Sequence, residues 1–177
     1  MRRISLGTIK VCPRPGQAAQ GLMRAGARVV PVALGRAGVR ADKREGDGGT
    51  PRGSYHPVRL WWRADRLRRP PSLLPARRIG RGDAWCEDPT DRRYNRSFNR
   101  SANEPGDRLW REDHLYDLLL ELDHNTRPRV AGRGSAVFIH VARPGLAPTA
   151  GCVALSLRDL RLLAGRIKAK TRIKIHI

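Results

Sequence analysis

Two residues near the end of the chain, His140 and Cys152, carry side chains that could act together as a base and a nucleophile. His140 lies at the end of the apolar run GSAVFIHVA, and Cys152 follows Gly151 after a short loop. A thiol is mostly protonated near pH 7, and a neighbouring histidine or helix N-terminus lowers its pKa and makes the thiolate available. Gly151 has no Cβ to keep a substrate away from backbone N–H groups that stabilise an oxyanion. The pattern predicts a cysteine nucleophile, with His140 as its base and Gly151 in the oxyanion pocket.

The same two residues also fit a purely structural role. Free cysteine is among the most buried residue types, and a histidine beside a strand is readily satisfied by a carbonyl group. From spacing alone we favour this structural interpretation. The cysteines Cys12, Cys86 and Cys152 are odd in number, which excludes a complete disulfide framework. The sequence has no CxxC pair and no His/Cys cluster at zinc spacing, so we expect no metal.

The segments on either side of this pair are predicted to be strands and one short helix. GSAVFIHVA is typical of a strand that ends near His140. Ser156 and Asp159 form a capping box, which predicts a helix soon after Cys152. The apolar face of that helix would be formed by Leu157, Leu160, Leu163 and Ile167. The tail TRIKIHI alternates and predicts a closing strand with Ile173, Ile175 and Ile177 pointing inward.

The first part of the chain is predicted to consist of strands and tight turns. TIKVCP (8–13) and ARVVPVALG (27–35) are rich in β-branched residues. QAAQGLMRAG between them fits a hairpin strand or a short helix, and we favour the hairpin. HLYDLLLELDHN is ambiguous, because its leucine content favours a helix whereas its alternation fits a strand. The alternating residues are Tyr116, Leu118, Leu120 and Leu122.

Two segments are expected to be irregular. GDGGTPRG is a loop dense in glycine and proline, and SYHPVRLWW resumes an extended pattern in which Pro57 marks an edge strand or an interruption. Residues 63–111 form a long irregular insertion rich in arginine and proline, typical of a lid or a binding loop. Its aromatic residues suit a stacking or anion-binding surface, but we favour a role in pinning the loop to the core. They are Trp85, Tyr94, Phe98 and Trp110.

Length and charge limit the possible classes of protein. A chain of 177 residues is long enough for one domain with a sizeable core, which we place at residues 1–177. No window is apolar enough to cross a bilayer, and no secretory signal peptide is visible at the start. The net charge of +20 favours polyanionic partners such as an anionic cell-wall polymer or nucleic acid, although a genome rich in G and C also raises the arginine content.

Two blocks of the sequence resemble the L,D-transpeptidase catalytic domain family, the YkuD type. GSAVFIHVARPGLAPTAGCVALSLRDL is similar to the active-site region of this family. The matching residues are His140, Thr149, Gly151, Cys152 and Val153. KREGDGGTPRGSY resembles an upstream block of the family. Its matching residues are Lys43, Gly46, Asp47, Thr50, Pro51, Gly53 and Tyr55.

The chain departs from the family pattern at two positions, which indicates a divergent branch. Ala150 stands where the family usually has a second histidine, and Ala154 where it commonly has arginine or asparagine. The second change removes a polar group that would hold the substrate. Arg143, or an arginine of the insertion, is a candidate replacement.

The resemblance implies a mainly β fold, a YkuD-like β-sandwich with a short helix after the active-site cysteine and an insertion at about 63–111. It implies a peptidoglycan L,D-transpeptidase that needs no metal or organic cofactor and acts in the periplasm or cell envelope. Cys152 would attack a stem-peptide carbonyl to form a thioester, and a neighbouring stem amine would then complete a 3-3 or 1-3 cross-link. His140 would transfer the protons, and the N–H groups of Gly151 and Cys152 would hold the oxyanion.

Four further residues are candidates for substrate binding: Thr149, Arg143, Tyr55 and Trp85. Thr149 would bond His140 or substrate, or else cap the loop, and Tyr55 and Trp85 would line the cleft or only pack. Two alternative functions stay open. The same acyl-enzyme could react with water, which would give a carboxypeptidase or amidase. The less favoured alternative is a basic nucleic-acid-binding protein, since the basic residues are scattered and no known nucleic-acid motif is present.

Overall fold

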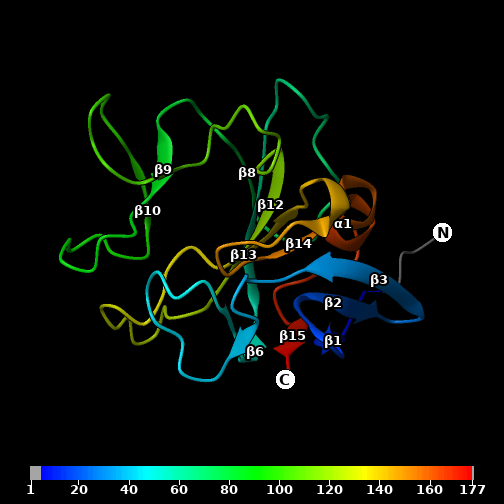
Figure 1. Cartoon of the computed structure of the whole chain (residues 1–177). Coiled ribbons are helices and arrows are strands. Elements are labelled where there is room, and N and C mark those ends of the chain that lie inside the picture. The colour runs from blue at the N-terminus through cyan, green and yellow to red at the C-terminus, as the bar shows by residue number, and fades with distance from the viewer. Residues whose placement is uncertain (1–4, 177) are drawn as a thin grey trace.

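The structure of the protein is a computed structural model that describes residues 5–176. Its main feature is a ten-stranded sheet in the order β6-β15-β1-β2-β3-β14-β13-β12-β7-β8, shown with the rest of the chain in Figure 1. The strands of this sheet are β1 (Thr8–Arg14), β2 (Gln17–Ala25), β3 (Arg28–Ala33), β6 (Gly53–Tyr55), β7 (Pro57–Trp62), β8 (Ala76–Arg78), β12 (Leu118–Leu122), β13 (Phe138–Val141), β14 (Val153–Leu155) and β15 (Arg172–Ile175). The predicted mainly β fold is confirmed.

Two smaller sheets and one α-helix complete the described part of the chain. A three-stranded sheet has the order β10-β9-β11, and β4 pairs with β5. Their bounds are β4 (Val39–Arg40), β5 (Thr50–Pro51), β9 (Asp83–Trp85), β10 (Ser97–Asn99) and β11 (Asp107–Arg108). The helix α1 spans Leu157–Ala164, and a 3₁₀ turn lies at Pro144–Leu146. Within residues 5–176, none of the helical segments has the length and apolar character to span a bilayer.

The N-terminal hairpin prediction is confirmed, because QAAQGLMRAG forms β2 and pairs antiparallel with β1. Gly16 turns the chain with a φ of 72°. Gly21 on β2 lies close to β1, and a Cβ at this position would stand 2.5 Å from the carbonyl oxygen of Cys12. The second half of β2 alternates between buried and exposed residues, with Met23 fully buried. A helix would have lost this alternation.

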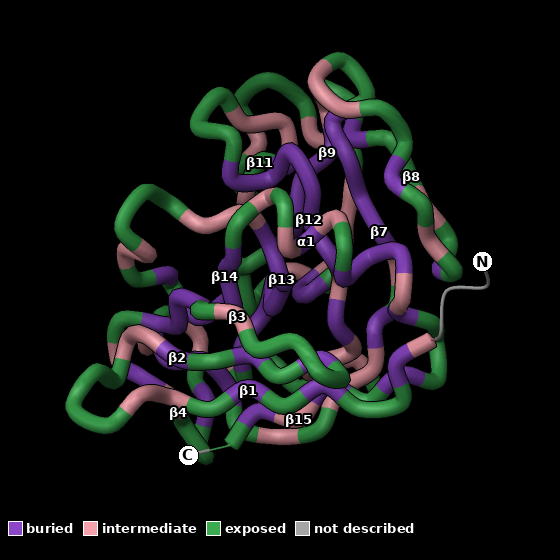
Figure 2. Tube along the Cα trace, turned by 90° about the vertical axis from the view of Figure 1, so that its right-hand side faces the viewer, coloured by how far each residue is buried: buried purple, intermediate pink, exposed green. Residues whose placement is uncertain are grey.

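One core cluster unites the two halves of the main sheet. Ile9 of β1 and Val32 of β3 pack in the same cluster as Leu60 of β7, Leu118 of β12 and Leu160 of α1. Strands from both ends of the sheet therefore enclose one core, which α1 helps to cover. Figure 2 shows the buried residues concentrated along the central strands, while the connecting loops are largely exposed.

The predicted helix and closing strand are present. Ser156 caps α1 by accepting a hydrogen bond from the Asp159 amide. Leu160 and Leu163 are buried, Leu157 is half-buried, and Ile167 is buried just beyond the helix. In β15, Ile173 and Ile175 point inward as predicted. Ile177 lies outside the described residues.

A second core cluster lies against the β7–β12–β13 part of the sheet. It contains Trp61, Leu119, Phe138 and Cys152. The ambiguous segment HLYDLLLELDHN therefore contains a strand, β12, with residues buried on both faces, which explains its run of leucines at 118–120. The predicted alternation was wrong at Tyr116. This residue precedes β12 and packs in the second cluster, whereas Leu118 packs in the first.

The insertion at 63–111 is largely irregular, but it also contains β8 at the edge of the main sheet and the strands β9, β10 and β11. Trp85 and Tyr94 pin it to the core, as favoured from the sequence, whereas Phe98 is half-buried against the guanidinium of Arg93. Trp85 and Tyr94 are buried, and the guanidinium of Arg63 lies 3.6 Å from the ring centroid of Trp110. Pro57 begins β7 after an interruption at His56, and β7 lies inside the sheet. The loop GDGGTPRG is not wholly irregular, since part of it forms β5.

Candidate active site

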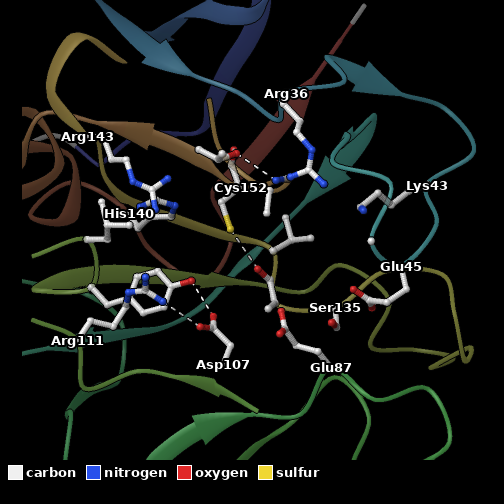
Figure 3. A pocket seen from close by; sticks show the side chains of 18 residues that line it. Arg36, Lys43, Glu45, Glu87, Asp107, Arg111, Ser135, His140, Arg143 and Cys152 are labelled. Carbon is white, nitrogen blue, oxygen red and sulfur yellow. Dashed lines mark hydrogen bonds and ion pairs between the residues drawn. The ribbon is translucent and has the colours of Figure 1, made fainter. Parts of the chain in front are cut away.

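Cys152 and His140 line the same cavity, which has a volume of about 430 Å³ (Figure 3). The parallel pairing of β13 and β14 brings them together, because His140 is in register with Ala154, two residues beyond Cys152. Side chains two residues apart on a strand share a face. His140 therefore lies on the face of Phe138, and the backbone N–H of Phe138 donates to Cys152 Sγ over 3.4 Å. The two residues are 6% and 9% exposed, so both lie at the floor of the cavity.

The imidazole of His140 is oriented by its own strand. Nδ1 lies 2.8 Å from the carbonyl oxygen of Val141, and the ring meets the edge of Tyr116 with a centroid distance of 5.4 Å. Burial lowers the pKa of His140 to about 4, so the ring is neutral at pH 7. Because a neutral ring must be a donor at the nitrogen that faces a carbonyl, Nδ1 carries the proton and Nε2 has a free lone pair.

The thiol of Cys152 is protonated at rest. Sγ donates to the carbonyl oxygen of Ala136 over 3.1 Å, and burial raises its pKa to about 12. The prediction of a thiol with a lowered pKa is therefore wrong for the unliganded structure. The helix N-terminus gives no help, because β14 separates Cys152 from α1 and the buried side of α1 packs in the other core cluster.

Thr149 closes the turn that leads to Cys152. Its hydroxyl donates to the carbonyl oxygen of Cys152 over 2.7 Å and accepts from the N–H of Gly151 over 3.1 Å. Of the alternatives left open by the sequence, the structure shows loop capping. The N–H of Gly151 was predicted to face the substrate. It instead donates to Thr149 inside the turn.

Gly151 is needed at its position for a different reason. Its φ is 149°, and a Cβ there would stand 2.8 Å from the carbonyl oxygen of Gly49. The two sequence blocks that resembled one family therefore meet at this point, backbone against backbone. The loop that holds Gly49 is itself braced by Asp47, which accepts from the amides of Arg44 and Gly49, both over 2.8 Å.

Lys43 connects this loop to the cavity. It is 8% exposed and lines the cavity, and its Nζ donates to Asp47 Oδ1 and to the carbonyl oxygen of Arg44, both over 2.6 Å. A lysine has three N–H donors, which leaves one beyond these two bonds. Lys43 stood in the upstream block but was not among the predicted site residues, although the block itself was the available signal.

Three carboxyl groups also line the cavity: Glu45, Glu87 and Asp107. Asp107 accepts from the hydroxyl of Tyr116 over 2.7 Å, and burial raises its pKa. Desolvation, with the nearby charges of Asp107 and Glu45, raises the pKa of Glu87 to about 7. Sequence reasoning missed all three, because they come from separate segments and no local spacing connects them.

Only some of the predicted substrate-binding residues line the cavity. Arg143 lines the cavity and is exposed, as is Arg36, which the sequence did not indicate. Tyr55 and Trp85 are not among the residues that line it. The Tyr55 hydroxyl donates to the carbonyl oxygen of Arg52, and Trp85 is buried with its Nε1 donating to Asn95. Both therefore pack, and a role in lining the cleft is corrected.

Comparison with known proteins gave one match. The family model of YkuD, described as the L,D-transpeptidase catalytic domain, matches residues 18–175. The matched range contains the loop of Lys43, the insertion at 63–111, and both His140 and Cys152. Neither a curated protein nor a solved structure matches the chain significantly.

Proposed function

Because the chain belongs to the YkuD family of L,D-transpeptidase catalytic domains, we propose that it cross-links peptidoglycan stem peptides through a thioester at Cys152. The linkage would be of the 3-3 or 1-3 type. The observation that carries this proposal is the shared cavity, which is lined both by a buried thiol and by an imidazole whose Nδ1 is held by a carbonyl group, so that Nε2 keeps its lone pair. A structural cysteine would have no need of an oriented base and a cavity of about 430 Å³ in front of it.

In the first half-reaction, Cys152 Sγ attacks a stem-peptide carbonyl carbon while His140 Nε2 accepts the thiol proton. Because burial disfavours both a thiolate and an imidazolium here, the proton moves as the sulfur–carbon bond forms. The tetrahedral oxyanion then collapses, the carbon–nitrogen bond breaks, and the imidazolium gives its proton to the leaving amine. The low pKa of His140 makes its protonated form a strong acid, which favours this last transfer.

The oxyanion would be held by the donors that the structure leaves near Sγ. With the Gly151 amide engaged by Thr149, we assign this role to the N–H of Cys152 and to the third N–H of Lys43. Removal of one oxyanion donor costs about 3 kcal/mol of transition-state stabilisation in enzymes of this general type. No metal or organic cofactor enters these steps.

The basic groups at the rim would bind the anionic parts of the substrate. Arg143 and Arg36 line the cavity and are exposed, so their guanidinium groups suit a stem-peptide carboxylate. This would compensate for Ala154, which stands where the family commonly has a polar residue. The net charge of +20 would attract the domain to an anionic wall polymer, consistent with a location in the cell envelope.

The test is incubation with defined tri-, tetra- and pentapeptide muropeptides, followed by mass spectrometry of the protein and products. A thioester at Cys152 and cross-linked dimers are expected. Shortened monomers without dimers would instead indicate a carboxypeptidase or amidase. Cys152→Ala should form neither adduct nor product, and its retained activity would refute the assignment. Strong, salt-sensitive nucleic-acid binding by an inactive protein would favour the remaining alternative.

A further inference from the structure

The cavity contains two carboxylates that this arginine-rich protein leaves without a cation. Most aspartates and glutamates of the described residues lie in ion pairs with arginine, lysine or histidine. Glu45 and Glu87 form no such pair within residues 5–176. Glu45 accepts only from the hydroxyl of Tyr94. Asp88 and Glu121 are likewise unpaired among the described residues, and Glu87 is exposed, so a missing cation alone does not indicate a ligand. Glu45 and Glu87 differ from them because both line the cavity of Cys152, where a cationic ligand could pair with them together.

One arginine that lines the cavity is already engaged. Arg111 lines the cavity, but it is paired with Asp107 and Asp113. The basic residues Arg36 and Lys43 come from the opposite side of the cavity in Figure 3, where Glu87 and Asp107 lie below Cys152. Arg111 lies beside Asp107 in this view, and Glu45 lies below Lys43 of its own loop. The wall below Cys152, which carries most of the carboxyl groups, is called the acidic side.

An unsatisfied hydroxyl lies on the acidic side. Ser135 is 8% exposed and lines the cavity. Its Oγ lies near the hydroxyl of Tyr94, which donates to Glu45, but makes no hydrogen bond of ordinary geometry to the described residues. Figure 3 places it between Glu45 and Glu87. Buried hydroxyls are normally hydrogen-bonded, so this one has room for a polar ligand group, and beside two carboxylates that group would be a donor. An ammonium group, with three donors, would satisfy Ser135 and both carboxylates together.

We infer that Glu45, Glu87 and Ser135 form the acceptor site, which binds the primary ammonium of the incoming amine, and that Glu87 takes its proton. This inference rests on the proposed function. An ammonium has no lone pair, so it must lose a proton before it can attack the thioester. The Glu87 carboxylate accepts that proton, the amine nitrogen bonds to the thioester carbon, and the carbon–sulfur bond breaks. The departing Cys152 sulfur takes up the second proton that the nitrogen releases, through His140, and the thiol is restored.

The site also gives the insertion at 63–111 a role. Glu87 follows β9 and Asp107 lies in β11, so the small three-stranded sheet builds the acidic side of the cavity. Glu45 comes from the loop braced by Asp47. The acceptor site would thus be formed by three segments: the loop of Glu45, the insertion with Glu87, and the residues just before β13 with Ser135.

The experiment compares two nucleophiles on the same acyl-enzyme. The full chain is loaded with a tetrapeptide muropeptide and offered either Nα-acetyl-lysine, whose side chain is an ammonium at pH 7, or hydroxylamine, which is neutral at pH 7. Glu87→Gln should lower amide formation with Nα-acetyl-lysine on the order of 10²-fold, as expected for loss of a general base. Formation of the hydroxamate should fall much less, because hydroxylamine needs no deprotonation. Glu45→Gln should raise the KM for Nα-acetyl-lysine more than it lowers kcat.

Asp88→Asn is the matched control. Asp88 neighbours Glu87, is exposed and does not line the cavity, and this change removes the same charge, so both products should be unaffected. Equal losses of amide and hydroxamate in Glu87→Gln would overturn the inference, as would no loss of amide. If the unaltered protein forms no acyl-enzyme, the proposed function itself is refuted and the acceptor site is refuted with it. If hydroxylamine captures an acyl-enzyme in every variant, the proposed function stands, and an unexpected result for Glu87→Gln then refutes only the acceptor site.

Discussion

The resting state of Cys152 can be tested by the pH dependence of its alkylation. A thiol with a pKa of about 12 is ionised to about 10⁻⁴ at pH 8, whereas an ordinary thiol with a pKa of about 8.5 is about one quarter ionised. The thiolate, which is the form that alkylates, should be on the order of 10³-fold rarer in the folded protein than in the unfolded chain. Its rate with iodoacetamide should therefore rise tenfold per pH unit from pH 7 to 10 without levelling off.

The assay follows the Cys152 peptide by mass spectrometry at a series of pH values. A Cys12→Ser, Cys86→Ser background leaves one thiol, and the same protein unfolded in urea supplies the reference, which should level off above its pKa. Because Cys152 is 9% exposed, limited access also slows the reaction, but access changes the rate and not the pH at which it levels off. A plateau near pH 7 would show a thiolate–imidazolium pair at rest and would refute the reasoning from burial. His140→Gln should leave the slope unchanged, since the ring does not stabilise a thiolate in the unliganded protein.

Three further changes follow from the site. The buried neutral His140 has a pKa of about 4, below its unfolded value of about 6.5, so the folded protein binds fewer protons in this interval and loses about 3 kcal/mol of stability as the pH falls through it. Urea unfolding at pH 7 and pH 4 should show this loss in the unaltered protein and not in His140→Gln. Equal losses in both proteins would contradict the assignment of the effect to His140. Gly151→Ala should destabilise the fold by about 1–3 kcal/mol, because its Cβ would meet the Gly49 carbonyl at an unfavourable φ, and an unchanged Tm would argue against this contact. Thr149→Val should cost about 1–3 kcal/mol by leaving a buried carbonyl and amide unpaired, measured by urea unfolding beside Thr149→Ser, which keeps both hydrogen bonds and should lose less.

Several parts of the fold could be predicted because they depend on neighbours in the sequence. The capping box at Ser156, the β-branched residues of β1, the alternation in β15 and the hairpin of β1 and β2 are local patterns, and each is present in the structure. The ambiguity of HLYDLLLELDHN also had a local cause. A strand buried on both faces has no polar side, and only the cores on either side of β12 decide its type.

The sequence by itself determined the candidate pair of His140 and Cys152 and the glycine before it, because the order of residue types in two short blocks carries that information. Only the tertiary structure decided the charge state of the pair. A pKa depends on how much water surrounds a group, and both side chains are buried at the floor of the cavity, Cys152 within the second core cluster and His140 against its Tyr116. It likewise decided that Tyr55 and Trp85 pack elsewhere, and that Glu45 and Glu87 meet across one cavity from distant segments. Such meetings depend on contacts between residues far apart in the chain, which no pattern of neighbours can record.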